Sequence, residues 1–427
     1  MIDSREEIKF ELPANPAEAI DNDNKTFMII WSWGLRCNYD CSYCSPERHN
    51  AYSPHTEKEN LLKAVKFLKE YKAKLSNFID HKNWFISITG GEPTANPHFI
   101  DTVKELRMQA PGFKLDVTTN GSFNNKIRDT ITENFDHITI SYHAEADQKL
   151  KSKVLENIRH FKNNGPKIKV NLMMHAYEYW DECVELANIF IEEKINFVPR
   201  IIGESMEKNR FNHQYSELQQ KWMKDFWKVD SNKNINDKPT EVQKSDATKA
   251  KEIKEDNKKR KPENAAGLAK ANLGRYCCGK LDMCSFGKET KKWETTKLIN
   301  HTKFQTWHCL INFYFLYIDQ EADQVWHHQT CKANWDPNRE FFRDPNKSGK
   351  DIQSPIGKIS DYKQILKDLD ERTKGGFIPM IQCPRTSCGC GVCVPKAKDA
   401  GIADMLFKKH IKGLHPAWKN KLEEENK

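Results

Sequence analysis

Cys37, Cys41 and Cys44 lie in one short segment that follows the apolar run Phe27–Trp31. Side chains so close together cannot all point into a core, and they are too close to pair in disulfides with one another. Thiolates are ligands for soft metals and for iron–sulfur clusters. Three of them leave one iron of a 4Fe–4S cube without a protein ligand, so a small molecule can coordinate there and receive an electron. The ring of Tyr43 suits a flat partner such as adenine.

Two more motifs follow at predicted strand ends. Residues 86–94 read Ile-Ser-Ile-Thr-Gly-Gly-Glu-Pro-Thr, and residues 117–121 read Val-Thr-Thr-Asn-Gly. With the Cys-x3-Cys-x2-Cys spacing, these motifs resemble the signature of the radical S-adenosylmethionine (radical SAM) enzymes. The resemblance covers the first half of the chain. It implies a 4Fe–4S cluster and S-adenosylmethionine as cofactors, and reductive cleavage of the latter to a 5′-deoxyadenosyl radical.

The resemblance also implies a set of cofactor-binding residues. Gly90 and Gly91 lack side chains, so the backbone could approach the methionyl group, and Glu92 offers an acceptor for its ammonium. The planar fork of Arg200 suits a carboxylate, although ordinary polarity at a strand end is an equal alternative for this residue and for Ser141. The full expected set is Tyr43, Gly90, Gly91, Glu92, Thr119, Asn120, Ser141 and Arg200.

Two histidines, His143 and His175, follow later predicted strands. Imidazole titrates near neutrality, so each is a candidate catalytic proton donor or acceptor. The alternative, which we favour, is a hydrogen-bonded structural histidine. Cys183 falls in a helical pattern, and we expect a buried small side chain rather than a metal ligand.

Short β-branched or aromatic runs alternate with amphipathic helical patterns from Thr26 onward, which predicts parallel strands joined by crossover helices. The predicted strands are Phe27–Trp33, Trp84–Thr89, Lys114–Thr119, His137–Ser141, Ile168–Met173 and Phe197–Ile202. The predicted helices are Lys58–Tyr71, Phe99–Met108, Lys126–Asn134, Gln148–Asn163 and Asp181–Glu193. The fold class is therefore α/β, a partial (β/α)6 TIM-type barrel like that of the resembled family. In such barrels the chemistry gathers at the carboxyl ends of the strands.

A second cysteine-rich region follows, for which we expect a smaller α+β domain. Its cysteines are Cys277, Cys278, Cys284, Cys309, Cys331, Cys383, Cys388, Cys390 and Cys393. The region resembles the auxiliary-cluster (SPASM or twitch) extensions of radical SAM enzymes, which implies one or two further Fe–S clusters. The tandem Cys277-Cys278 and the crowded Cys388-Gly-Cys390 depart from the usual spacing. A structural zinc site is the alternative for these thiols.

Composition bounds the remaining choices. The chain has 427 residues, 68 basic and 60 acidic, and a net charge of +8, which permits an acidic partner without requiring one. We find neither an export signal nor a membrane-spanning run, and expect a cytoplasmic protein with reduced cysteines. The expected organisation is a lead-in over 1–25, the barrel over 26–230, a charged linker over 231–270, the auxiliary domain over 271–400 and a basic tail over 401–427.

The expected partners are a flavodoxin- or ferredoxin-like electron donor and either a peptide or a small-molecule substrate. The lead-in is too short for a peptide-binding winged-helix domain, so a small molecule stays open. One alternative is a transferase that moves a methyl or aminocarboxypropyl group from S-adenosylmethionine. Another is a non-catalytic zinc or nucleic-acid-binding protein. In the linker, acidic residues interleave with lysines, which favours a solvated segment over a nucleic-acid arm.

Overall fold

A computed structural model describes most of the first half of the chain and several parts of the second. The described residues are 19–20, 26–44, 49–77, 81–202, 215–230, 307–328, 355–374, 381–383, 394 and 396–398. The predicted linker over 231–270 and the tail over 401–427 lie outside them. None of the helices in this described part is long and apolar enough to cross a membrane.

The main sheet has eight strands in the order β10-β9-β2-β3-β4-β5-β6-β7. Its six parallel strands are β2 (Thr26–Ser32), β3 (Asn83–Thr89), β4 (Lys114–Thr119), β5 (His137–Tyr142), β6 (Lys167–Met174) and β7 (Phe197–Ile201). From β2 to β7 each strand pairs with the next one along the chain. The predicted alternation is therefore confirmed. The described strands form an open sheet, a partial barrel rather than a closed one.

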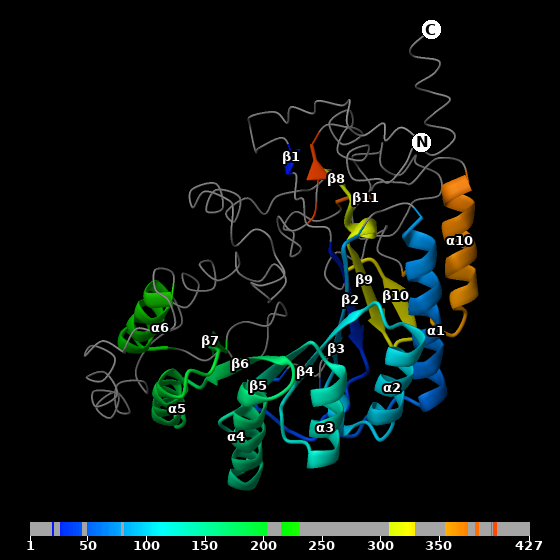
Figure 1. Cartoon of the computed structure of the whole chain (residues 1–427). Coiled ribbons are helices and arrows are strands. Elements are labelled where there is room, and N and C mark those ends of the chain that lie inside the picture. The colour runs from blue at the N-terminus through cyan, green and yellow to red at the C-terminus, as the bar shows by residue number, and fades with distance from the viewer. Residues whose placement is uncertain are drawn as a thin grey trace.

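Helices connect these strands along one face of the sheet (Figure 1). They are α1 (Lys58–Leu75), α2 (Phe99–Gln109), α3 (Asn125–Asn134), α4 (Gln148–Asn163) and α5 (Trp180–Glu192), and α6 (Glu217–Asp230) follows β7. Each predicted helix is confirmed, and α1 runs four residues beyond its predicted end at Tyr71. A short 3-10 turn, η1 (Pro93–Ala95), follows β3.

The two faces of the sheet differ in chemistry. Trp31, Ile88 and Val117 occupy neighbouring positions in register, and all three are fully buried in one core with residues of α1 and α2. The opposite face, here called the polar face, carries Ser87 and Asp116 in register with the apolar Ile30, and there Ser87 Oγ donates to Asp116 Oδ2 at 2.7 Å. One face therefore packs against the helices, and the polar face carries the polar side chains of β3 and β4.

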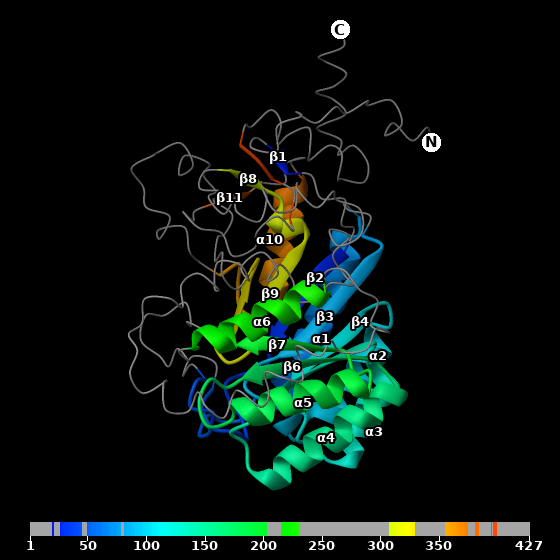
Figure 2. The same ribbon diagram turned by 90° about the vertical axis from the view of Figure 1, so that its left-hand side faces the viewer.

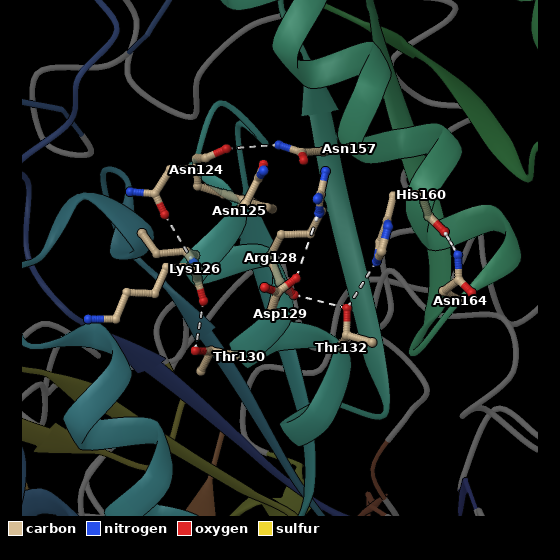
Figure 3. Close-up of polar contacts among 12 residues, drawn as sticks. Asn124, Asn125, Lys126, Arg128, Asp129, Thr130, Thr132, Asn157, His160 and Asn164 are labelled. Atoms are coloured by element: carbon tan, nitrogen blue, oxygen red, sulfur yellow. Dashed lines mark hydrogen bonds and ion pairs between the residues drawn. The ribbon is translucent and has the colours of Figure 1, made fainter.

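A row of polar contacts, here called the polar seam, runs along α3 and links it to α4 through Thr132 and His160 (Figure 3). Asn124 caps α3, its side chain accepting from Ile127 N, and Thr132 Oγ1 lies 3.2 Å from His160 Nε2 of α4. Thr130 and Thr132 each donate their hydroxyl to the backbone carbonyl four residues earlier in α3. These contacts lie within and between helices of the outer layer, so we interpret the seam as structural.

The hairpin of β9 (Phe315–Asp319) and β10 (Gln324–Trp326) comes from the predicted auxiliary domain but joins the barrel sheet. β9 is parallel to β2, with Met28 opposite Phe315. Gln320, at the end of β9, accepts from Trp31 Nε1 at 3.0 Å. The sequence predicts a strand over Leu310–Ile318, and the structure begins it at Phe315 after a 3-10 turn, η6 (Ile311–Phe313). Strands β9 and β10, which belong to the region expected as the auxiliary domain, thus extend the barrel sheet.

A second sheet combines the chain's early and late segments and lies above the barrel in both overall views (Figure 2). Its order is β1 (Ala19–Ile20), β12 (Lys396–Ala397), β8 (His308–Cys309) and β11 (Ile381–Gln382), with antiparallel pairing throughout. Part of the predicted lead-in is thus a strand. Helix α10 (Tyr362–Lys374), predicted over Ile365–Arg372, packs against α1, with Lys74 Nζ 2.5 Å from Asp370 Oδ2.

Candidate active site at the carboxyl ends of the strands

The segment after β2, residues 33–44, is here called the cluster loop because it carries Cys37, Cys41 and Cys44. It ends in a tight turn in which Cys44 N donates to Cys41 O at 3.0 Å. This turn brings the second and third cysteines to neighbouring positions. All three thiols are partly exposed, and none is in a disulfide.

The start of the cluster loop is hydrogen-bonded to the loop after β3. Gly91 N donates to Gly34 O at 2.7 Å, and Glu92 N donates to Arg36 O at 2.8 Å. A Cβ atom at Gly91 would lie 2.3 Å from the carbonyl oxygens of both Leu35 and Arg36. Gly90 has a φ of +144°, and a Cβ there would lie 2.7 Å from Gly34 O. Both glycines are thus needed for backbone approach between these two loops.

Glu92 is buried and joins the ends of β3 and β4. Its Oε1 accepts from Thr94 N at 3.0 Å and from Thr119 Oγ1 at 2.7 Å, and its Oε2 accepts from Asn120 N at 2.6 Å. Burial raises the pKa of this carboxyl, and the hydrogen bonds to its ionised form act in the opposite direction. The structure therefore brings Glu92, Thr119 and Asn120 together, as their positions at strand ends predicted.

The middle of the cluster loop is tied to the segment that follows β4. Asn120 Nδ2 donates to Asn38 Oδ1 at 2.7 Å, and Asn38 Nδ2 donates to Ser122 Oγ at 3.0 Å. Ser122 Oγ in turn donates to Asn120 Oδ1 at 2.7 Å. This closed ring of three polar side chains fixes Asn38, the residue directly after the first cysteine.

His143, at the end of β5, lies against the last part of the cluster loop. Its Nδ1 is 2.6 Å from Tyr43 Oη and 3.5 Å from Cys41 Sγ. The rings of His143 and Tyr43 are stacked, with centroids 5.9 Å apart. Burial lowers the pKa of His143 to about 4, so the ring is neutral near pH 7. Tyr43, predicted as a stacking surface for adenine, stacks here on this imidazole.

His175, directly after β6, pairs with a carboxylate that the sequence reasoning missed. His175 Nε2 lies 3.2 Å from Glu145 Oε1, and Tyr177 N donates to His175 Nδ1 at 3.3 Å. Because Nδ1 accepts, Nε2 carries the proton that is donated to Glu145. Glu145 also accepts from Ser42 N at 2.8 Å and from Ser42 Oγ at 2.6 Å. Glu145 lies in the connection between β5 and α4, and no local sequence motif marks it.

Ser141 and Arg200 lie on the polar face of the sheet, one on each side of Asn171. Ser141 is opposite Asn171 in the pairing of β5 with β6, and Arg200 Nε donates to Asn171 Oδ1 at 3.2 Å. Tyr142 points to the other face, where its hydroxyl donates to Glu182 at 2.8 Å, so it packs against a helix. Met174, at the end of β6, is fully buried.

The three thiols fit an iron–sulfur cluster by their chemistry. Burial raises the pKa of Cys37 to about 11 and raises that of Cys41 further, and the negative charge of neighbouring thiolates adds to both shifts. A bound cation reverses this effect and stabilises the thiolates. Within the described ranges no three His, Cys, Asp or Glu side chains converge on a point where a single metal ion could sit. A 4Fe–4S cube does not require three side chains to converge on one point, because each thiolate binds a different iron.

Two of the nine later cysteines lie within the described residues. Cys309 and Cys383 are buried, and β8 and β11 bring them onto one face of the small sheet. The others lie outside the described residues: Cys277, Cys278, Cys284, Cys331, Cys388, Cys390 and Cys393. His327 and His328, which precede Cys331 in the sequence, are both buried. Cys183 is buried in α5, as predicted.

Comparison with known proteins gives a family-model match, sequence relatives and similar solved structures. The family model of the radical SAM superfamily matches residues 31–190. The chain is 24% identical over 170 residues to GTP 3′,8-cyclase of Clostridium perfringens, which covers 38% of this chain and 50% of the cyclase. It is 31% identical over 152 residues to the FeMo cofactor biosynthesis protein NifB of Azotobacter vinelandii, covering 33% of this chain and 29% of NifB. The chain thus spans half or less of the length of these relatives.

Among solved structures, anSMEcpe with bound AdoMet and the Cp18Cys peptide matches at 15% identity and a TM-score of 0.43, over 82% of this chain and 81% of that one. SuiB of Streptococcus suis matches at 12% identity and a TM-score of 0.41, over 82% of this chain and 67% of that one. The matched family model spans all three motifs of the site, from the cysteines to the end of β4. Residues 31–190 of this chain therefore form a radical SAM domain.

Proposed function

We propose that this chain is an enzyme that cleaves S-adenosylmethionine reductively and uses the 5′-deoxyadenosyl radical to modify an organic substrate. The observation that carries the proposal is the placement of the cluster loop. The loop sets three thiols beside the carboxyl ends of parallel strands, where barrel chemistry gathers, and it is hydrogen-bonded to the segment after β3 through Gly91 N and Glu92 N.

Each part of the site has a role in this proposal. Cys37, Cys41 and Cys44 would hold a 4Fe–4S cluster, which supplies the electron for cleavage when bound. Glu92 would accept a hydrogen bond from the methionyl ammonium, and its Oε2 accepts from the backbone amide of Asn120. Arg200, held by Asn171, would orient a carboxylate or ribose from the polar face of the sheet.

The products distinguish the proposal from its nearest rival. The chain is reconstituted anaerobically with iron and sulfide, incubated with S-adenosylmethionine and dithionite, and analysed by liquid chromatography and mass spectrometry. We expect 5′-deoxyadenosine, formed only when dithionite is present. Methylthioadenosine or S-adenosylhomocysteine as the main product would instead identify a transferase of an aminocarboxypropyl or methyl group.

We extend the proposal to one or two auxiliary Fe–S clusters held by the later cysteines. The burial of Cys309 and Cys383 on one face of a small sheet supports a shared ligand role, because buried thiolates fit a metal site that excludes water. Iron and sulfide counts above four per chain are expected, and they should fall in the Cys309→Ser and Cys383→Ser variants. Zinc in place of the additional iron would overturn this part of the proposal.

The substrate class is open between a peptide and a small molecule. The matched cyclase, and the S-adenosylmethionine-dependent nucleotide dehydratase of a Fibrobacter strain that is 27% identical over 177 residues, are named for reactions on nucleotides. These names favour testing nucleoside triphosphates first. A flavodoxin- or ferredoxin-like donor in a reducing cytoplasm would supply the electron. Salt-dependent retention on nucleic acid, without cofactor turnover, would favour the non-catalytic alternative.

A further inference from the structure

The cluster loop crosses the carboxyl edge of the sheet from β2 towards β6. Its early carbonyls, Gly34 O and Arg36 O, bind the segment after β3. Asn38 binds the segment after β4. The last part, from Cys41 to Tyr43, contacts residues that follow β5 and β6. The loop is therefore held at each successive strand end, and the final holding point is the one that fixes the second and third cysteines.

At this final point one carboxylate holds the turn between those two cysteines. Glu145 Oε2 accepts from Ser42 N at 2.8 Å, and Glu145 Oε1 accepts from Ser42 Oγ at 2.6 Å. Ser42 directly follows Cys41 and is the second residue of the turn closed by Cys44 N. Fixing the backbone at Ser42 therefore fixes the directions in which both neighbouring thiols leave the chain.

The carboxylate is itself held from the next strand. His175 Nε2 lies 3.2 Å from Glu145 Oε1, and the tautomer that donates there is set by Tyr177 N, which donates to His175 Nδ1. His175 is only 4% exposed, so its ring has little freedom to turn away. The contact ties Glu145 to β6 as well as to its own connection between β5 and α4.

We infer that Glu145 and His175 form a clamp that positions the Cys41–Cys44 turn for cluster binding and places a negative charge beside the bound cluster. Glu145 acts on the loop through Ser42, and His175 acts through Glu145, so both are positioning residues. This inference rests on the proposed cluster-binding role of the loop. It gives His175 a task different from proton transfer to or from a substrate.

The negative charge of Glu145 should change the reduction potential of the cluster in one direction, which a purely structural contact would not do. A cluster that takes up an electron becomes more negative, and a fixed carboxylate nearby disfavours that reduced form. Replacing Glu145 by a neutral side chain of similar shape should therefore make the cluster easier to reduce. Glu145→Gln keeps an acceptor oxygen for Ser42 and removes the charge, whereas Glu145→Ala removes both.

The first readout uses the iron-free full chain, so it does not depend on activity. Hydrogen exchange at the Ser42 amide is expected to be about tenfold faster in Glu145→Ala than in the wild type, since a hydrogen bond to a charged acceptor is lost. The Gln variant should fall between the two. Asp147→Asn is the matched control, because Asp147 lies in the same connection and caps α4 through Leu150 N. Equal exchange in the wild type and the Ala variant would overturn the clamp.

The second readout uses the reconstituted chain. Redox titration followed by electron paramagnetic resonance should show a more positive midpoint potential of the cluster in Glu145→Gln, and no shift in Asp147→Asn. His175→Phe keeps a ring and removes the donor, so it should speed exchange at Ser42 without removing the carboxylate. Unchanged exchange in His175→Phe, or an unchanged potential in Glu145→Gln, would refute the corresponding half of the inference. If no cluster assembles in the wild type, the proposed function fails while the exchange result still stands.

Discussion

Replacing Gly91 by alanine should separate the cluster loop from the end of β3. The added Cβ would lie 2.3 Å from the carbonyl oxygens of Leu35 and Arg36, and these are backbone atoms that cannot rotate away. The nearby hydrogen bonds Gly91 N to Gly34 O and Glu92 N to Arg36 O would lengthen or break. Overpacking costs about 1–3 kcal/mol, and each lost hydrogen bond adds about 1 kcal/mol. We expect a loss of about 3 kcal/mol in the free energy of unfolding.

Gly112→Ala is the matched control for this substitution. A Cβ at Gly112 would lie 2.4 Å from Lys72 Nζ and 3.8 Å from Lys72 Cε, atoms at the flexible end of a long side chain that can move away. Urea denaturation followed by tryptophan fluorescence measures both variants, and iron content after reconstitution measures cluster binding. Gly91→Ala should lose both stability and iron, and Gly112→Ala should lose little of either. Equal behaviour of the two variants would refute the close-approach reasoning.

Three further predictions concern residues around the site and its support. Burial lowers the pKa of His143 from 6.5 to about 4, so its ring should stay neutral by NMR down to about pH 5. As the pH falls from 6.5 towards 4, the histidine is protonated in the unfolded chain but not in the folded one, so the free energy of unfolding should decrease over this range. Burial raises the pKa of Asp136, but hydrogen bonds from Leu115 N and Arg107 outweigh this effect, so the net shift of the pKa is downward. The wild type should therefore lose stability as the pH falls below about 4, and Asp136→Asn should lose less, as measured by urea denaturation. Glu321→Ala removes the acceptor for Leu35 N and should cost about 1 kcal/mol in urea denaturation, with faster hydrogen exchange at that amide.

Three results would contradict these predictions. A His143 resonance that titrates near its ordinary pKa would show that the ring is not desolvated beside Tyr43. If Asp136→Asn lost stability with falling pH as steeply as the wild type, the pairing of Asp136 with Arg107 would not be a cause of that loss. Unchanged exchange at Leu35 in Glu321→Ala would show that the β9–β10 turn does not support the cluster loop.

The sequence pattern predicted the barrel strands and helices because their apolar periodicity is strong and local. The run from Phe27 to Trp31 is almost continuously buried, as are the middles of β3 and β4, and runs of this kind are typical of parallel strands. The pattern could not predict that β9 pairs beside β2, because a strand's apolar alternation does not name its partner. The sequence therefore did not indicate that a hairpin from the expected auxiliary domain extends the first sheet.

The candidate site likewise combines residues that local sequence motifs indicate with residues that only the fold brings together. Cysteine spacing and a Gly-Gly-Glu sequence are local signals, and they placed the cluster loop and Glu92 correctly at strand ends. Glu145 has no such signal, because its contacts join three segments that are distant in the sequence. The reason for the glycine pair also emerged only in three dimensions, since the atoms that a Cβ at Gly91 would meet belong to another loop.

The central claim is that the thiols of Cys37, Cys41 and Cys44 hold the group that delivers an electron to S-adenosylmethionine. The most direct test compares a triple alanine variant at these positions with Cys183→Ala, whose thiol is buried in α5 and is not part of the cluster loop. Formation of 5′-deoxyadenosine under dithionite is measured in both. The account predicts that the triple variant forms none and that Cys183→Ala retains it. Undiminished 5′-deoxyadenosine from the triple variant would contradict the account.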